Sequence, residues 1–352
     1  MGMTTMTAAQ TRPDDPRLGP AREETLMPTA DFEQVLAQHR RELHVHCYRM
    51  LGSYTDAEDL VQETFLRAWQ HRDDYAPGTN LRAWLYRVAT NACIDAIRAR
   101  RRQVPRDSGQ AEATWLEPYP DVLLDQVAAP GDTPDAAVVA RETIELAFIA
   151  AIQALPPRQR AVLVLSASLG WSPGETALAL RMTRAAVNSA LQRARATLRE
   201  RLPDDRAGWR APSLTDEERA TLRRFIDIHE RGDAAAAAAL MRADIVATMP
   251  PQPGVYRGRA AIAPLLDIAF GPAGLGQWRL VPAGANRQPA AASYLRRPGD
   301  GQFRAYKLDV LRVVDGQVAE TTTFDATLFP AFGLPGIWPG RPGGEAACGS
   351  GS

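Results

Sequence analysis

The chain has little of several features that would point to other classes of protein. Its three cysteines, Cys47, Cys93 and Cys348, are too few and too scattered for a disulfide framework or a zinc site, so we expect no metal centre. No apolar run approaches the ~20 residues of a membrane span, and no hydrophobic signal segment begins the sequence. We therefore expect a cytoplasmic protein without a membrane partner. No glycine-rich phosphate-binding loop is present, and no cofactor is expected.

Lysine is almost absent, since Lys307 is the only one, and the formal net charge is zero. The positive charge, nearly all arginine, is nevertheless concentrated in blocks. Residues 31–74 carry five arginines against nine acids, and residues 75–106 carry seven against one. Residues 107–145 then carry one arginine against nine acids, and residues 146–202 carry eight against two. Two basic segments joined by an acidic one predict two nucleic-acid-binding modules, because phosphate neutralisation supplies most non-specific affinity. For any single arginine, a solvated face or an ion pair is the alternative.

A length of 352 residues is enough for two to three domains. Composition and hydrophobic periodicity predict a multidomain protein with two all-α modules, the second with a helix-turn-helix, followed by an α+β domain. We divide the chain into a disordered extension (1–29), a first module (30–106), an acidic linker (107–135), a second module (136–203), a short linker (204–212), a C-terminal domain (213–334) and a flexible tail (335–352).

The first module has the pattern of three helices. A helix that begins near Asp31 ends at Gly52-Ser53, and Thr55 or Asp56 is in position to cap a second helix that runs to about His71. Asn80 opens a long third helix. Trp84 and Leu85 lie on its apolar stripe, so we expect them in the core.

The second module contains the signature of a helix-turn-helix. Ser172-Pro-Gly-Glu175 is a capping box with proline at the first helical position, and Thr183 can cap the helix that follows. The second helix of such a motif enters the major groove with its N-terminal residues at the base edges. The alternative is an arginine-rich structural hairpin. The candidate DNA contacts are Arg184, Asn188, Ser189, Gln192 and Arg193.

The order of these modules resembles a sigma-70-type transcription initiation factor of the extracytoplasmic-function (ECF) group. The run Asp56–Trp69 resembles the region that grips core RNA polymerase, and Trp84–Arg98 resembles the region that melts and reads the −10 promoter element. Leu155–Leu163 with Gly170-Trp171-Ser172 resembles the reader of the −35 element. One departure is Ala190, where the family often has a basic residue.

The resemblance implies partners and residues. The partners are core RNA polymerase and promoter DNA. Core polymerase contacts would come from Asp59, Gln62 and Glu63, and a solvated helix face is the alternative. The −10 contacts would come from Asn80, Arg82, Arg87, Asn91, Arg98 and Arg102. The acidic linker would occupy the basic channels of the polymerase as a nucleic-acid mimic, unless it is merely a flexible connection.

The C-terminal domain combines helices with strand-like segments over 277–281, 290–295, 304–314 and 317–324, and Asp315-Gly316 predicts a two-residue hairpin turn. Gly258–Ile262 and Thr321–Asp325 resemble the SnoaL-like fold, a cone-shaped α+β barrel. Four side chains are candidates for an acid or base inside the cone: His229, Tyr306, Asp309 and Asp325. No partner for a catalytic carboxylate is evident, so we expect no enzyme activity, and a small-molecule ligand in this domain is left open.

The resemblance gives the C-terminal domain a regulatory role. We expect it to dock on the sigma modules and to modulate promoter-directed initiation by core RNA polymerase. The docking residues would be Trp115 and Tyr119 in the linker and Phe329 and Phe332 in the C-terminal domain, with local packing as the alternative. The rival hypothesis for the whole chain is a helix-turn-helix DNA-binding protein fused to a SnoaL-like isomerase or cyclase.

Overall fold

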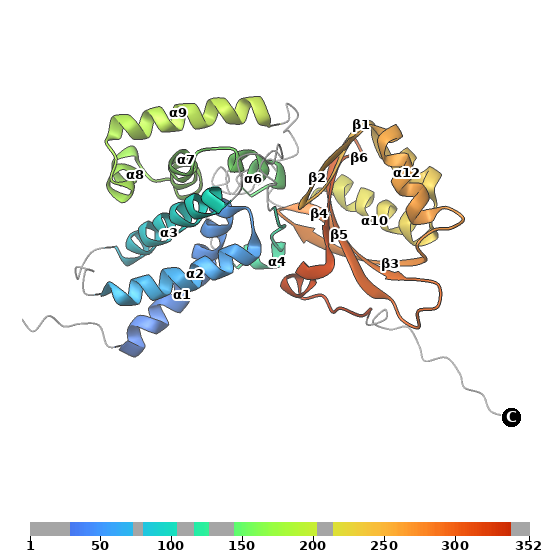
Figure 1. Cartoon of the computed structure of the whole chain (residues 1–352), viewed down its shortest axis with the longest axis horizontal. Helices are drawn as coiled ribbons and strands as arrows, with labels where there is room; N and C mark the ends of the chain where they lie inside the picture. The colour runs from blue at the N-terminus through green and yellow to red at the C-terminus, as the bar shows by residue number, and fades with distance from the viewer. Residues whose placement is uncertain (1–28, 73–79, 104–115, 127–143, 203–213, 339–352) are drawn as a thin grey trace, which may run out of the picture.

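The computed structural model describes residues 29–72, 80–103, 116–126, 144–202 and 214–338 (Figure 1). Trp115 and residues 1–28 of the predicted N-terminal extension lie outside these residues, as does the side chain of Arg102. Helices α1 to α9 form one body, and the C-terminal sheet with its helices forms a second body beside it (Figure 1). The predicted order of two helical modules followed by an α+β domain is therefore confirmed.

The first module consists of α1 (Thr29–Leu51), α2 (Tyr54–Gln70) and α3 (Leu81–Gln103), which pack against one another. The predicted break lies at Gly52, whose φ of 74° suits glycine. The predicted cap at Thr55 or Asp56 was wrong. Ser53 is extended and its side chain accepts a hydrogen bond from the backbone nitrogen of Asp56, so the cap lies two or three residues earlier than predicted. Trp84 and Leu85 are buried, as predicted.

The second module consists of α6 (Leu146–Gln153), α7 (Pro157–Leu169), α8 (Pro173–Leu180) and α9 (Arg184–Arg201). The predicted capping box is present, because Ser172 and Glu175 bond each other's backbone nitrogens. Thr183 caps α9 as predicted, accepting a hydrogen bond from the backbone nitrogen of Ala186. Arg181 takes the left-handed conformation between the two helices and makes the turn tight.

Between the modules, residues 116–119 form neither helix nor strand, Pro120 pairs with Ala285, and the short helix α4 (Asp121–Leu124) follows. The C-terminal domain begins with α10 (Asp216–Arg231) and α11 (Ala234–Leu240), and α12 (Arg259–Phe270) follows later. Its strands are β1 (Met241–Met249), β2 (Gln252–Arg257), β3 (Gln277–Ala285), β4 (Gln288–Arg296), β5 (Arg304–Val314) and β6 (Gln317–Asp325), and the 3-10 helix η3 (Ala326–Phe332) comes last.

The sheet has the order β2-β1-β6-β5-β4-β3, with β1 parallel to β6 and the other neighbours antiparallel. One face buries Leu280 and Leu311 against Phe225 of α10 and its neighbours. The opposite face, with Tyr294 and Val310, belongs to the same buried cluster as the helical modules. The sheet thus separates two cores.

The sequence analysis missed β1 and β2 and the turn between β3 and β4, and it predicted β3 and β4 too short. The predicted turn at Asp315-Gly316 is present, and both residues have positive φ. Ile337 and Trp338, predicted to lie in the tail, instead pair with the start of β5 at Arg304 and Phe303. None of the described helices is long and apolar enough to cross a bilayer.

Candidate polymerase and nucleic-acid interfaces

The outer face of α2 carries the predicted polymerase contacts. Asp59 and Gln62 are exposed, and Asp59 has no ion-pair partner among the residues described. Glu63 is half-exposed and pairs with Arg67, with 2.6 Å between Oε1 and Nε. Leu66 follows one turn later on the same stripe and leaves 51% of its surface exposed. Sequence reasoning missed Leu66, because the helical period alone does not say which apolar side chain stays outside. The face combines acidic, polar and apolar groups.

Two of the predicted −10 residues, Asn80 and Arg82, bond other groups of the protein. Asn80 caps α3, its Oδ1 accepting from the backbone nitrogen of Ala83 at 3.1 Å. Arg82 pairs with Glu42 at 2.7 Å between Nη2 and Oε2. Three exposed side chains have no such partner within the described part of the chain. They follow one another along α3 at spacings of four and seven, which places them on one helix face: Arg87, Asn91 and Arg98.

Helix α9 presents all of the predicted −35 residues to solvent. These are Arg184, Asn188, Ser189, Gln192 and Arg193. Arg184 lies over Gly174 of α8, where an added Cβ would come within 3.2 Å of Nη2. Ala190 is buried in the stripe that packs on the rest of the module, so a side chain here does not reach the exposed face. Alanine in place of the family's frequent basic residue at position 190 therefore affects how α9 packs on its module.

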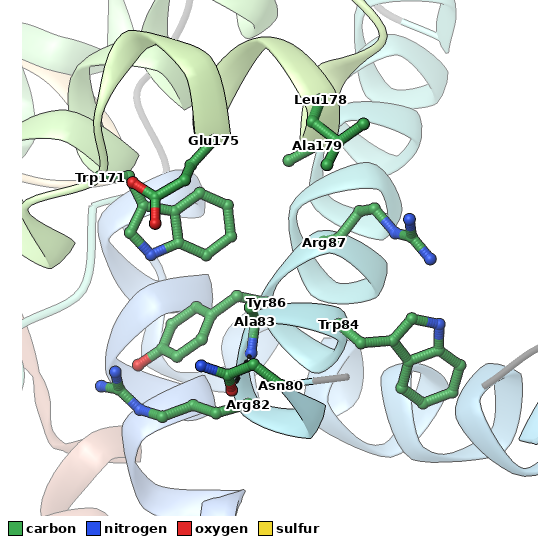
Figure 2. Close-up of a pocket in the computed structure, with 10 residues that line it drawn as sticks. All are labelled: Asn80, Arg82, Ala83, Trp84, Tyr86, Arg87, Trp171, Glu175, Leu178 and Ala179. Carbon is green, nitrogen blue, oxygen red and sulfur yellow. Dashed lines mark hydrogen bonds between the residues drawn. The ribbon is translucent and has the colours of Figure 1, made fainter. Parts of the chain in front are cut away.

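The two candidate DNA-contacting elements lie side by side. Tyr86 of α3 and Trp171, which precedes α8, meet edge to face with 6.3 Å between ring centroids. A cavity of about 390 Å³ lies between them, lined by residues of α3 and of the first helix of the helix-turn-helix (Figure 2). Its lining residues are Asn80, Arg82, Ala83, Trp84, Tyr86, Arg87, Trp171, Glu175, Leu178 and Ala179. We call this contact the α3–α8 seam.

A buried arginine joins the modules beside the seam. The Arg160 guanidinium on α7 donates to the carbonyl of Met50 at the end of α1, at 2.6 Å from Nη1. The same side chain donates to the carbonyl of Gln153 at 2.6 Å from Nη2. Through these bonds to carbonyl groups of both modules, the buried cation joins α7 to α1.

The linker is held between the first module and the C-terminal domain. Glu117 caps the start of α2, accepting from Ser53 Oγ at 3.0 Å and from the backbone nitrogen of Thr55 at 2.8 Å. Tyr119 is fully buried, and its hydroxyl lies 2.7 Å from Nδ1 of His44. Burial lowers the pKa of His44 to about 4, so this histidine is neutral at pH 7.

The turn between β3 and β4 is the centre of the junction. Its two residues, Asn286 and Arg287, both have positive φ, and Asn286 is 0% exposed. The Asn286 side chain accepts from the backbone nitrogen of Tyr119 at 2.8 Å and donates to Tyr48 Oη at 2.8 Å. It also donates to the carbonyl of Ile144 at 2.7 Å, just before α6. One side chain thus binds α1, the linker and the start of the second module.

Neighbouring residues extend this junction. The backbone nitrogen of Arg287 donates to Asp121 Oδ1 at 2.7 Å, and its guanidinium pairs with Asp125. Gly284 lies directly under the linker, because an added Cβ would come within 2.5 Å of Asp121 Oδ2. Sequence reasoning predicted Tyr119 as a docking residue but missed Asn286. Phe329, the other predicted anchor that is buried, packs on Tyr294 of its own domain at 5.3 Å between centroids, and Phe332 is half-buried.

The cone interior holds some of the predicted acid and base residues. Asp309 is buried, 2.9 Å from Lys307 Nζ, and accepts from Thr323 Oγ1 at 2.7 Å. Burial, with Lys307 nearby, lowers the pKa of His229 to about 4. The expectation that Asp325 lies in the cone was wrong, because it is exposed and caps η3 through the backbone nitrogen of Thr327. Among the described residues, no group of three or more His, Cys, Asp or Glu is placed to hold a metal ion.

Comparison with known proteins gives matches along most of the chain. Residues 35–103 match sigma-70 region 2, residues 145–198 match sigma-70 region 4, and residues 222–321 match the SnoaL-like domain. The chain is 42% identical over 319 residues to the ECF RNA polymerase sigma factor SigG of Mycobacterium tuberculosis, covering 87% of this chain and 84% of that protein. It is 32% identical over 173 residues to SigW of Bacillus subtilis, covering 49% of this chain and 89% of that protein.

The fold is also similar to a crystal structure. The extracytoplasmic function sigma factor SigJ of Mycobacterium tuberculosis aligns with a TM-score of 0.58 at 23% identity, covering 86% of this chain and 99% of that one. At this identity the likeness concerns the arrangement of the elements alone. It includes both helical modules and the C-terminal sheet domain.

Proposed function

The chain belongs to the ECF group of sigma-70 family RNA polymerase sigma factors and carries a SnoaL-like C-terminal domain, and from this premise we propose that the docked domain holds it in a closed form that must open on promoters. Its partners are core RNA polymerase and promoter DNA, which implies action in the compartment that holds both, the bacterial cytoplasm. The proposed modules are 30–106, 136–203 and 213–334, and each contains one of the three family matches.

The observation that carries the proposal is the closeness of the two DNA-contacting elements. The −10 and −35 elements lie about 25 base pairs apart, which is roughly 85 Å of B-DNA at 3.4 Å per pair. The rings of Tyr86 and Trp171 are 6.3 Å apart. Modules in contact at the seam cannot occupy both elements at once. The described arrangement is therefore the closed form, and engagement of both elements requires the seam to open.

In the closed form, the residues proposed to bind core polymerase in the first step of initiation remain exposed. The proposed polymerase contacts Asp59 and Gln62 are exposed on α2, away from the seam. The proposed −35 residues of α9 are exposed as well. We propose that core polymerase binds α2 first, and that polymerase and promoter together then separate the modules. A ligand shifts the equilibrium between the closed and open forms only if it binds the open form more tightly.

The junction at Asn286 supports control by the C-terminal domain. It contacts both modules and the linker, so its release removes one contact that all three share. Because the domain shares a chain with its target, the effective concentration is ~mM for a short flexible connection, and weak contacts suffice to keep it docked. Docking depends on contacts within the protein and requires no small-molecule ligand.

We propose a regulatory rather than a catalytic role for the C-terminal domain, although the SnoaL-like family includes enzymes. The buried carboxylate Asp309 is engaged by Lys307 and Thr323, and Asp325 serves as a helix cap. The relatives do not favour the rival hypothesis of a DNA-binding protein fused to an isomerase or cyclase.

In vitro transcription with bacterial core RNA polymerase tests the proposal. Gly284→Ala adds a methyl group where the Asp121 carboxylate now lies, so this side chain must move and its bond to the backbone nitrogen of Arg287 is disrupted. Gly301→Ala is the matched control, because a Cβ there meets nothing within 4 Å. We expect wild type and control to give the same promoter-specific transcript level at limiting protein, and Gly284→Ala to give several times more. Equal output from all three would contradict control by docking, and no transcript from any of them would contradict the sigma function.

A further inference from the structure

Four arginines gather at the end of the sheet farthest from the junction. They are Arg279 on β3, Arg296 and Arg297 at the end of β4, and Arg304 at the start of β5; we call them the distal arginine cluster. Gln277 pairs with Arg296, and Leu295 pairs with Arg304, so the four residues lie at the same end of the three strands. The nine residues of β3 separate this end from the β3–β4 turn, about 30 Å at ~3.4 Å per residue. In Figure 1 the connection from β4 to β5 lies on the side of the domain away from helices α1 to α9.

Aromatic rings hold three of these guanidinium groups in place without neutralising them. Arg296 and Arg279 both lie over the ring of Phe303, at 4.7 Å and 5.5 Å from its centroid. Arg297 lies 6.0 Å from the centroid of Tyr306. Arg279 also donates to the carbonyl of Trp278 at 3.1 Å. A guanidinium has five donors, so most remain available to a ligand, and ordering beforehand reduces the entropy lost on binding.

The cluster lacks the acidic partners that other arginines of this domain have. Arg242 pairs with Asp244, and Arg312 pairs with Glu320, both at 2.9 Å. Within the described part of the chain, no carboxylate forms an ion pair with any of the four cluster residues. The acid of the adjoining loop, Asp300, instead accepts from the backbone nitrogen of Arg297 at 3.2 Å. Four positive charges are thus left for an external anion.

We propose that the distal arginine cluster binds the phosphate backbone of DNA, giving this sigma factor a third DNA contact that is independent of sequence. The arginines occupy three neighbouring strands, which span about 10 Å at ~4.8 Å per strand. This matches the axial distance over about four successive phosphates of one DNA strand, at ~3.4 Å per step. The planar guanidinium fork suits bidentate phosphate binding, and contacts to phosphate alone carry no sequence information.

The proposal rests on the proposed function only in that the sigma modules bring DNA near this domain. Because the cluster faces away from the junction, it is accessible while the domain is docked. An acidic protein surface, such as one on the polymerase, is the competing partner that the experiment separates from DNA.

The test uses the full chain and a 30-base-pair duplex without promoter elements, with binding followed by fluorescence anisotropy from about 50 to 200 mM NaCl. Each phosphate contact contributes about 0.9 to the slope of log K against log salt. We expect the triple variant R296A/R297A/R304A to lower this slope by roughly 2 to 3. The control R223A/R224A/R257A removes three exposed arginines elsewhere in the same domain and so matches the change in charge. It should leave the slope near that of wild type.

A third variant, R296K/R297K/R304K, separates loss of charge from loss of packing on Phe303, and we expect it to keep most of the slope. Equal slopes for the alanine triple and its control would overturn the proposal. So would an alanine triple that binds DNA normally but binds core polymerase more weakly, since the cluster would then face protein. Promoter-specific transcription by the wild-type chain, measured separately, distinguishes failure of this inference from failure of the sigma function.

Discussion

Asn286 in the β3–β4 turn accepts a hydrogen bond from the backbone nitrogen of Tyr119, 167 residues earlier in the chain, at 2.8 Å. The backbone nitrogen of Asn286 donates back to the carbonyl of Tyr119 at 2.9 Å. The pair joins the C-terminal domain to the linker between the two helical modules. Release of this pair is the step that we expect to couple domain docking to promoter binding.

Removal of the Asn286 side chain should undock the linker. Asn286→Gly keeps a residue that accepts positive φ but removes three buried hydrogen bonds, about 2–3 kcal/mol in total, or roughly 30- to 150-fold in the docking equilibrium. Hydrogen exchange of residues 116–125 should accelerate by a comparable factor. Asp315→Gly is the control. It also places glycine at a positive-φ position, in the β5–β6 turn away from the junction, and should leave the exchange of residues 116–125 unchanged. Protection that survives in Asn286→Gly would show that other contacts hold the linker.

Charge reversal on α2 should weaken polymerase binding. Asp59→Arg places a cation on an exposed face that we expect to meet basic polymerase helices, and we predict at least a tenfold rise in the Kd for core enzyme, about 1.4 kcal/mol. The control Asp267→Arg reverses an exposed acid on α12. Both variants should keep the helical circular dichroism of wild type. Similar Kd values for the two would move the polymerase contact to another face.

Two arginines of α9 should affect DNA binding differently. Arg184 lies at the first turn of the helix, where base edges are read, and Arg184→Ala should relax preference at one promoter position by ~1–3 kcal/mol. Arg199 lies in the last turn, and Arg199→Ala should weaken binding evenly and reduce the salt dependence. A promoter-library binding profile at two salt concentrations measures both effects. Indistinguishable profiles would contradict the assignment of Arg184 to base reading.

Acid should destabilise the fold through buried histidines. Burial lowers the pKa of His44 and His229 to about 4 and that of His46 to about 3, against an ordinary value near 6.5. The unfolded chain therefore binds protons that the folded chain does not, so stability is full above pH ~6.5 and falls as pH drops toward 4. Each histidine contributes up to about 1.4 kcal/mol per pH unit.

Urea unfolding between pH 7.5 and 4.5 measures this slope. His46→Gln should reduce it by roughly a third, because Gln can still bond Thr90, which lies 2.8 Å from His46 Nε2, but does not titrate. His71→Gln changes an exposed histidine and should leave the slope unchanged. A slope that does not depend on His46 would mean that other groups dominate the acid transition.

Local signals in the sequence predicted most of the helical modules. The capping box at Ser172 and the cap at Thr183 are formed by neighbours within three residues, so they can be read directly. The β5–β6 turn was predictable for the same reason, because Asp315-Gly316 favours positive φ at both positions. Family resemblance supplied the polymerase and DNA partners, which composition and spacing alone do not identify.

The junction was not predictable, because its stability is tertiary. Asn286-Arg287 lacks the glycine that marks such turns, and Arg287 at a φ of 60° is stabilised by Asp121 and Asp125 of the linker. β1 and β2 were missed for a related reason. The buried positions of β1 do not alternate, since its pairing with β6 shifts register between Met241 and Val246. No local pattern in a single sequence records contacts between such distant segments.

The central claim is that the docked C-terminal domain keeps the two DNA-contacting modules together. The most direct test is a pulsed electron paramagnetic resonance distance between spin labels at Asp95 on α3 and Arg195 on α9, both exposed. We predict a single short distance in the free chain, a growing long-distance fraction in Asn286→Gly, and an increase of tens of ångströms in the complex with core polymerase and promoter DNA. One short distance in all three samples would contradict the claim.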